Sequence, residues 1–398
     1  MNYKNKKRKI GLVLSKPPAY SETFLISKIE GLQASGFEVI LFVNKDSSKF
    51  ELCKVYKSYA NYRNNFLSKI WSLIIVILKL IRIPKRVIKF IRLEQKSGRN
   101  TIQILKNSYT CAHILSHNLD WLHFGYATLT LNKENISKSI NAKMAVSFRG
   151  YDINVYPLKF KGCYDLLWKR LDKVHSISNF LIKRASQFGM PNNLDIKIIT
   201  PAVAPSFFEV PLNMKPSKKI KIVTVARFNW IKGLDIAIQT MYLLKKSGVE
   251  FEYHIIGSGS ESECERYKFQ VIERQLENDV FFHGRLIHIE TKELLLNSTI
   301  YLQPSLSEGF CNAVLEAQAL GLLCVVSDRG ALSENVIHEK TGWIVFKTNP
   351  FGFEKAIKEV ISLSENKKNT IRVDAKSRVA SEFNIKKQQQ EFVEFYAK

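Results

Sequence analysis

The fold is decided by the stretch Ser305-Leu306-Ser307-Glu308-Gly309-Phe310-Cys311-Asn312-Ala313-Val314-Leu315-Glu316-Ala317-Gln318-Ala319-Leu320-Gly321. Just upstream, the apolar residues 300–302 predict a short buried strand, which Pro304 ends. From Asn312 onward, an Ala- and Leu-rich run predicts a helix that Gly321 closes. The stretch is therefore expected to be a strand–loop–helix junction of an α/β sheet.

Two carboxylates stand eight residues apart across this junction, Glu308 in the loop and Glu316 on an outward-facing side of the helix. Gly309 lets the backbone approach a ligand closely because it has no Cβ. The free N–H groups of the helix point at the same loop, and a helix N-terminus binds anions. The junction therefore predicts a site for a diphosphate, with two carboxylates for sugar hydroxyls. The alternative is an ordinary turn with two solvated glutamates.

The spacing, together with the Pro-Ser before it, the Glu-Gly-Phe inside it and the Leu-Glu-Ala-x-Ala-x-Gly run after it, resembles the Glu-x7-Glu signature of retaining glycosyltransferases of family 4. The resemblance implies the GT-B architecture, in which two Rossmann-like, doubly wound α/β domains face a central cleft. It also implies that Glu316 holds the ribose of a nucleotide-sugar donor and that Glu308 holds the sugar near the reacting carbon. The neighbours expected to line the donor site are Gly309, Phe310, Cys311 and Asn312.

Length and composition are those of a globular protein with two cores: 398 residues, 45% apolar and 24% charged. The net charge of +24 indicates an anionic partner, which could be nucleic acid, an anionic membrane or a phosphorylated substrate. The six cysteines are scattered, so they favour neither a zinc site nor a disulfide framework and are typical of a reducing, cytosolic compartment. The apolar run near the start is too short for the core of a signal peptide.

The first half opens with a predicted strand over 9–14, a helix that ends near Gly36 and a second strand over 37–43. Ligands bind at the carboxyl ends of strands in such sheets, where Tyr20, Ser21 and Glu22 are expected. Their turn resembles one that lies near the acceptor in family 4 enzymes of surface-polysaccharide synthesis. No Gly-rich phosphate loop follows the first strand, which argues against a dinucleotide-binding enzyme.

Further strands are expected over 111–116 and 143–148, and His123 and Arg149 each follow an apolar run. A lone histidine at a strand end is more often structural. However, His-Phe-Gly and Phe-x-Gly-Tyr-Asp resemble the polysaccharide branch of the family, which includes colanic acid glycosyltransferases. That resemblance implies His123 and Asp152 on the acceptor side. Many members carry His at the position of Arg149, which cannot act as a base but can hold a phosphate or an acidic sugar.

Residues 63–96 stand apart as a basic amphipathic insertion. The cations recur at three- and four-residue steps at Lys79, Arg82, Lys85, Arg86, Lys89, Arg92 and Lys96. The apolar residues of the opposite side are Ile70, Leu73, Ile74, Ile77, Ile81, Ile88 and Ile91. The pattern predicts a helix that is kinked or interrupted at Pro84. Glu94 is the only acidic residue in this stretch, so the pattern favours an interfacial helix on an anionic membrane. The alternative is a core helix with a solvated basic face.

In the second half, Arg227 follows a predicted strand over 221–225 and Lys232 precedes a helix from Leu234. The two cations resemble the Arg-x4-Lys-Gly diphosphate element of the family. The resemblance implies that both stabilise the leaving diphosphate, on which negative charge grows as the glycosidic bond breaks. It also implies that the turns at Gly257 and Gly284 border the nucleotide.

The expected domains are an acceptor-binding domain over 1–210, a linker over 211–219 and a nucleotide-sugar domain over 220–383. A helix over 384–398 is expected to cross back to the first domain. The expected activity is transfer of a hexosyl group, with retention, from a nucleotide diphosphate sugar to a lipid-linked glycan in bacterial surface-polysaccharide synthesis. The expected place is the cytoplasmic face of the inner membrane. The residues expected to be catalytic are Glu308, Arg227, Lys232 and Arg149.

No metal or other cofactor is expected, because no metal-ligand pattern is visible and an arginine with a lysine can do a cation's work. Two other classes remain open. An epimerase or phosphorylase of the same architecture would not need the insertion at 63–96, and we identify no pyridoxal-binding lysine. A nucleic-acid binder should interleave its cations with aromatic residues, whereas this insertion interleaves them with Ile and Leu, so no nucleic-acid partner is expected.

Overall fold

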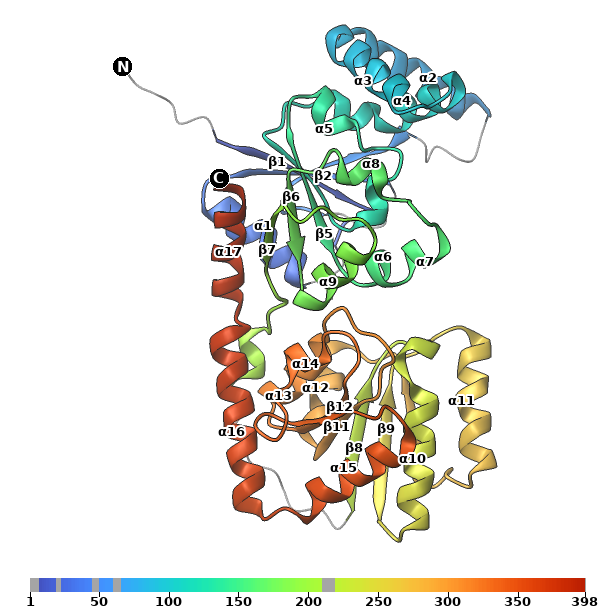
Figure 1. Cartoon of the computed structure of the whole chain (residues 1–398), viewed down its shortest axis with the longest axis vertical. Coiled ribbons are helices and arrows are strands. Elements are labelled where there is room, and N and C mark those ends of the chain that lie inside the picture. Colours follow the sequence, from blue (N-terminus) through green and yellow to red (C-terminus); the bar gives the residue numbers. More distant parts are fainter. Residues whose placement is uncertain (1–6, 19–22, 45–49, 60–65, 210–218, 398) are drawn as a thin grey trace. The chain divides into compact units, whose positions relative to one another are not determined.

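The computed structural model describes residues 7–18, 23–44, 50–59, 66–209 and 219–397. The chain forms two compact units, residues 1–199 with 388–398 and residues 200–387 (Figure 1). The chain thus divides at 199/200 and 387/388, whereas the sequence placed the boundaries near 210 and 384. Most of the expected linker, 211–219, lies outside the described residues.

The first unit is built on a seven-stranded sheet with the order β3-β2-β1-β4-β5-β6-β7, in which every pairing is parallel. Its strands are β1 (Lys9–Leu14), β2 (Glu38–Val43), β3 (Lys54–Lys57), β4 (Trp121–Phe124), β5 (Lys143–Phe148), β6 (Lys173–Ser176) and β7 (Asp195–Ile198). The strand order reverses between β1 and β4, and the carboxyl ends at such a point are where open α/β sheets bind ligands.

The other elements of this unit are mostly short. They are α1 (Thr23–Ala34), α5 (Ile136–Ser139), α6 (Tyr151–Asn154), α7 (Tyr156–Lys159), α8 (Asp165–Trp168), α9 (Asn179–Gln187) and the 3-10 turn η2 (Ala127–Thr130). α9 begins after Ser178, because the side chain of Ser178 accepts the N–H of Leu181. The central strands are buried on both faces, as parallel strands between helices should be.

The strand expected over 111–116 is wrong. These residues are the last turns of α4 (Thr101–Leu115), which Asn100 caps by accepting the N–H of Gln103. The buried residues Ile104, Ser108, Cys111 and Leu115 follow helical spacing. A short apolar run fits a buried strand and a buried helix equally well, and here the cap that distinguishes them lies eleven residues upstream.

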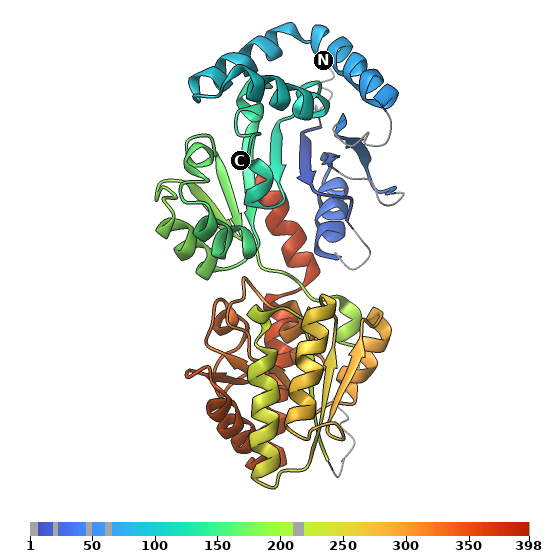
Figure 2. The same ribbon diagram turned by 90° about the vertical axis from the view of Figure 1, so that its right-hand side faces the viewer.

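Residues 66–96 form two helices, α2 (Phe66–Ile81) and α3 (Pro84–Lys96), which arch over one end of the first sheet (Figure 2). Pro84 is the first residue of α3, so the predicted interruption is confirmed. Within the described ranges, no helix is both long enough and apolar enough to cross a bilayer.

The second unit has a six-stranded parallel sheet with the order β10-β9-β8-β11-β12-β13. Its strands are β8 (Ile220–Val225), β9 (Phe251–Ile256), β10 (Val280–Gly284), β11 (Ile300–Gln303), β12 (Leu323–Ser327) and β13 (Trp343–Val345). Its helices are α10 (Leu234–Lys246), α11 (Glu261–Glu273), α12 (His288–Leu296), α13 (Asn312–Ala319), α14 (Leu332–Asn335), α15 (Pro350–Ser362), α16 (Glu365–Glu382), η3 (Pro205–Phe207) and η4 (Trp230–Lys232). Two parallel-sheet, Rossmann-like units confirm the expected fold class.

The last helix, α17 (Ile385–Ala397), belongs mainly to the first unit. Phe392, Phe395 and Tyr396 join the core formed by β1, β2 and α1. Gly31 of α1 provides the room, because a Cβ there would stand 2.6 Å from Cγ of Gln389. The carboxyl end of the chain thus completes the core of the amino-terminal unit.

Candidate functional site

Glu308 and Lys232 form an ion pair at the carboxyl edge of the second sheet. Glu308 lies in the loop after β11 and is 7% exposed, and its Oε1 is 2.6 Å from Nζ of Lys232. The same oxygen accepts from Oγ of Ser305 at 2.8 Å and from Nε2 of Gln303 at 3.4 Å. The described part of the chain offers no donor to the second oxygen, Oε2. The pair therefore positions Glu308 firmly while one carboxylate oxygen remains available to a ligand.

A chain of buried polar groups supports this carboxylate. The Tyr301 hydroxyl donates to Oε1 of Gln303 at 2.8 Å, and Nε2 of Gln303 donates to Oγ of Ser305 at 2.7 Å. Ser327 Oγ then donates to the carbonyl of Ser305 at 2.6 Å. These supporting roles were not predicted from the sequence. The one available signal was a Gln at the end of an otherwise apolar strand, because a buried amide must be hydrogen-bonded.

The backbone around Glu308 is closely packed at two glycines. Gly330 has φ +70°, and a Cβ there would stand 2.2 Å from the Glu308 carbonyl oxygen. Gly233 has φ +67°, and a Cβ there would stand 2.1 Å from the carbonyl oxygen of Pro304. Both positions exclude other residues for conformational and steric reasons. The loops after β8, β11 and β12 are thus fixed against one another.

The start of α13 is held by Asn335, whose Oδ1 accepts the N–H of Cys311 and whose Nδ2 donates to the Cys311 carbonyl, both at 3.1 Å. Burial, followed by the charge of Glu308, raises the pKa of the Cys311 thiol to about 12, so it is neutral. Phe310 is buried against Phe383, with 5.7 Å between the ring centroids. Of the residues expected to line the donor, Phe310 and Cys311 therefore shape the loop, while Asn312 is exposed.

Glu316 lies on α13 and is only partly exposed, whereas the sequence suggested an outward-facing residue. Burial raises the pKa of its carboxyl from 4.5 to about 7. Near neutral pH this group therefore exchanges between a carboxylate, which accepts hydrogen bonds, and a carboxylic acid.

The remaining candidates of the second unit lie at the same sheet edge. Arg227 is the second residue after β8 and is exposed. Gly257 follows β9 with φ +136°, and a Cβ there would stand 1.8 Å from the Ala226 carbonyl oxygen. Its N–H donates to the carbonyl of Gly284, the last residue of β10, at 2.8 Å. The carboxyl ends of β8, β9, β10 and β11 thus bring Arg227, Gly257, Gly284 and Glu308 to one edge.

The candidates of the first unit separate into buried and pocket-lining residues. Tyr20, Ser21 and Glu22 lie outside the described residues. Asp152 is buried and accepts the N–H groups of Ala127, Arg149 and Gly150, while burial raises its pKa. It therefore ties the turn after β5 to η2, and its place on the acceptor side stays a prediction.

His123 is also buried. Its Nε2 lies 2.7 Å from Oγ of Ser147, and its Nδ1 lies 2.6 Å from the hydroxyl of Tyr396 on α17. Burial and the nearby Lys28 lower its pKa well below 6.5. Both ring nitrogens are engaged inside the protein, so the structural alternative describes this histidine.

Arg149 lines a pocket of about 150 Å³ at the carboxyl ends of β1, β4 and β5. Its guanidinium lies 4.0 Å from the ring centroid of Phe24. The other lining residues are Leu14, Ser15, Lys16, Leu25, Gly125 and Tyr126. Among the first-unit candidates within the described ranges, Arg149 is the one that lines this pocket.

Residues 209–377, which include the whole edge with Glu308 and Lys232, match the family model of glycosyl transferases group 1. The chain carries a glycosyltransferase group 1 domain. This glycosyltransferase is 30% identical over 274 residues to the amylovoran biosynthesis glycosyltransferase AmsK of Erwinia amylovora, a match that covers 66% of each chain. It is 27% identical over 397 residues to the putative colanic acid biosynthesis glycosyltransferase WcaL of Escherichia coli K12, covering 94% of this chain and 96% of that one.

Solved structures share the fold of this glycosyltransferase and confirm the expected GT-B architecture. A glycosyltransferase from Rickettsia africae superposes with a TM-score of 0.71 at 19% identity, over 98% of both chains. Anabaena Alr3699/HepE in complex with UDP-glucose superposes with a TM-score of 0.70 at 15% identity, over 97% of this chain and 98% of that one. At such low identity the likeness shows the fold alone.

Across the described residues of the glycosyltransferase, no group of three or more His, Cys, Asp or Glu side chains is arranged to hold a metal ion. The expected cations at the second-unit edge, Arg227 and Lys232, come from the loop after β8 and from η4, and Arg285 and Arg329 follow β10 and β12 at the same edge. The edge therefore offers positively charged side chains together with the buried carboxylate of Glu308, which is paired with Lys232.

Proposed function

We propose that this glycosyltransferase moves a hexosyl group from a nucleotide diphosphate sugar to a lipid-linked glycan, with retention at the anomeric carbon. The observation that carries the proposal is the buried Glu308–Lys232 pair, fixed at the sheet edge that Arg227 shares. The relatives named for amylovoran and colanic acid biosynthesis support a surface-polysaccharide acceptor. The cytoplasmic face of the inner membrane, where such an acceptor would lie, is part of the proposal.

In this mechanism Arg227 and Lys232 stabilise the diphosphate as it leaves. Negative charge grows on the leaving group as the glycosidic bond breaks, and fixed cations stabilise that charge most where water is excluded. Glu308 accepts from sugar hydroxyls through Oε2, since Oε1 already has three donors. Glu316 accepts from the ribose hydroxyls when it is ionised.

Retention is explained best by attack on the same face that the diphosphate leaves, with the departing phosphate taking the acceptor proton. A covalent route needs a free carboxylate as the nucleophile. Glu308 is a weak nucleophile because Lys232, Ser305 and Gln303 all donate to its Oε1 and draw charge away from Oε2, and Asp152 is bound by three backbone N–H groups. The anomeric configuration of the product, read by NMR, checks this step, and an inverted product would overturn it.

The two cations also lead us to propose that no metal ion is needed. Activity in the presence of EDTA should equal activity without it, because Arg227 and Lys232 carry the charge that a divalent ion would supply. Complete loss of activity, restored by one added divalent metal, would contradict this proposal.

The test of the proposed function is thermal unfolding with UDP, GDP, ADP or CMP. A ligand at 100 times its dissociation constant adds about 2.7 kcal/mol of stability. We expect one nucleotide to raise the melting temperature of the wild type and of Glu359→Ala, a matched control on the exposed face of α15, but not of Glu316→Ala. No shift with any nucleotide, from a folded sample, would refute the donor site.

A further inference from the structure

The outward side of α2 is almost entirely apolar. The exposed side chains of this helix include Ile70, Trp71, Leu73, Ile74, Ile75, Ile77, Leu78 and Ile81, which we call the α2 apolar surface. Trp71 is 65% exposed and Ile81 is 67% exposed. An ordinary surface helix carries polar residues on this side, and a contiguous apolar surface of this kind marks an interaction site.

α2 rests on the rest of the first unit along one narrow side. Ser72 and Val76, one helical turn apart, are each 2% exposed. Oγ of Ser72 lies 2.6 Å from the hydroxyl of Tyr109 on α4, so this side faces the protein. The sequence placed the cations of 63–96 opposite its isoleucines on a helix kinked or interrupted at Pro84. In the structure most of the exposed isoleucines lie on α2 and most of the exposed cations lie on α3.

The exposed charges around the α2 apolar surface are positive. They are Lys69 on α2, Arg82 between the helices, and Lys85, Lys89, Arg92 and Lys96 on α3. Glu94 is the single acidic residue between 66 and 115, and it is fully buried. A surface with an apolar centre and a cationic border matches the acyl chains and phosphates of an anionic bilayer.

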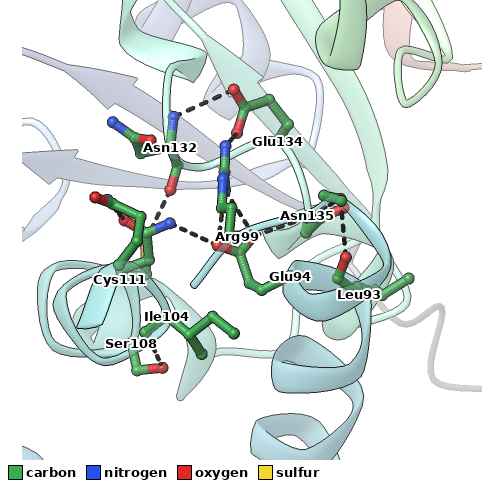
Figure 3. A network of polar contacts seen from close by, with 12 residues as sticks. Leu93, Glu94, Arg99, Ile104, Ser108, Cys111, Asn132, Glu134 and Asn135 are labelled. Carbon is green, nitrogen blue, oxygen red and sulfur yellow. Dashed lines mark hydrogen bonds and ion pairs between the residues drawn. The ribbon is translucent and has the colours of Figure 1, made fainter. Parts of the chain in front are cut away.

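A polar network holds the basic helix in place (Figure 3). The Glu94 carboxylate accepts from Arg99 at 2.7 Å, from Asn107 at 2.5 Å and from Asn135 at 2.7 Å. Arg99 also donates to Glu134 at 2.6 Å. The network joins α3 to α4 and to the segment before α5, and it removes the one local carboxylate from the surface. This network fixes α3 on α4, and the contact between Ser72 and Tyr109 fixes α2 on the same helix.

We infer that α2 and α3 dock this chain on an anionic lipid bilayer, with the α2 apolar surface among the acyl chains and the α3 cations on lipid phosphates. This inference rests on the proposed function, in which the acceptor is linked to a lipid, and it adds the surface through which the protein would contact that lipid's membrane. Binding to vesicles can be measured without glycosyl transfer, so failure of one proposal is distinguishable from failure of the other.

The experiment is flotation of the full chain with vesicles of phosphatidylcholine alone or with one-third phosphatidylglycerol. The wild type should float with the anionic vesicles at least tenfold more than with the neutral ones. The double variant Trp71→Glu with Leu78→Glu should float about tenfold less than the wild type. The double variant Lys85→Glu with Arg92→Glu should also float less than the wild type, and this difference should be seen at low salt, where charge–charge attraction is not screened. These substitutions are on exposed positions, so each variant should keep the wild-type melting temperature and nucleotide-dependent shift.

The matched control is Phe351→Glu with Lys355→Glu on α15, which changes one exposed aromatic residue and one exposed lysine of the second unit. It should float like the wild type. Wild-type chain that stays in solution with anionic vesicles, or α2 variants that float undiminished, would overturn the inference. A further contradicting outcome concerns a second copy of the chain. If the wild type sediments as a dimer, and the α2 variants sediment as monomers but float like the wild type, the α2 apolar surface binds a second copy and the inference is wrong.

Discussion

At the scale of single residues, the ammonium of Lys232 is already bound when a diphosphate reaches the edge of the second sheet. Glu308 holds it at 2.6 Å. A phosphate oxygen must therefore share Lys232 with Glu308, and any shift of the ammonium toward phosphate would loosen the carboxylate. Donor binding and the positioning of Glu308 are coupled through one short contact.

This coupling predicts the behaviour of a double-mutant cycle. Lys232→Met should lower the free energy of unfolding by about 3 kcal/mol, because it leaves a buried carboxylate unpaired. Combining it with Glu308→Gln should recover part of that loss, with a coupling energy of about 1–3 kcal/mol in urea unfolding. Additive losses would show that the pair does not exist in solution. Activity of Lys232→Met should fall about 100-fold or more.

Glu316 gives a second residue-scale prediction. Because its folded pKa is raised to about 7 from 4.5, its contribution to stability is complete below pH 4.5 and is lost as pH rises toward 7. Glu316→Gln, which stays neutral, should therefore be more stable than the wild type at pH 8 by about 2 kcal/mol and similar to it at pH 4.5. Chemical denaturation at the two pH values measures this, and equal differences at both would contradict the pKa.

At the scale of elements, α17 is fastened to the first sheet by a directional chain of hydrogen bonds. The Ile199 carbonyl can only accept, so Nε2 of His175 donates to it at 2.9 Å, and Nδ1 of His175 accepts from Ser147. Ser147 in turn accepts from Nε2 of His123, whose Nδ1 accepts the Tyr396 hydroxyl proton. The chain is complete only while both imidazoles are neutral.

Two measurements follow from this chain. Tyr396→Phe leaves a buried imidazole nitrogen without its donor and should cost about 1–3 kcal/mol of unfolding free energy. Because burial holds the pKa of both histidines well below 6.5, stability should be complete above pH 6.5 and fall as the pH drops below it. His338→Gln, at a half-exposed histidine, should keep this pH dependence, and a flat profile from pH 8 to 5 in the wild type would contradict it.

The sequence alone predicts some elements of the fold and not others. Strands β1, β2, β5, β8 and β11 were predicted within about a residue, since continuous apolar runs bounded by glycine or polar residues fit few other structures. The ion pair of Glu308 with Lys232 was not predicted, because 76 residues separate them and only the sheet order brings them together. The burial of His123 likewise depends on Tyr396 near the other end of the chain.

At the scale of the whole molecule, the positive charge is concentrated. Residues 66–115 hold nine of the 24 net positive charges in an eighth of the chain. The exposed face of α2 could not be predicted, because the same isoleucine pattern fits a helix buried on a core. Only the tertiary structure shows that one narrow side packs and the rest is open.

α3 and the pocket with Arg149 lie at opposite ends of the same strands. Arg86 and Lys89 bond to the segments that lead into β4 and β5, whereas Arg149 follows the last residue of β5. A six-residue strand is about 20 Å long. If α2 and α3 rest on a bilayer, the length of the first unit sets the distance between the membrane and the pocket with Arg149. A lipid-linked glycan shorter than this distance should be a poor acceptor on vesicles. The same glycan released from its lipid should react freely.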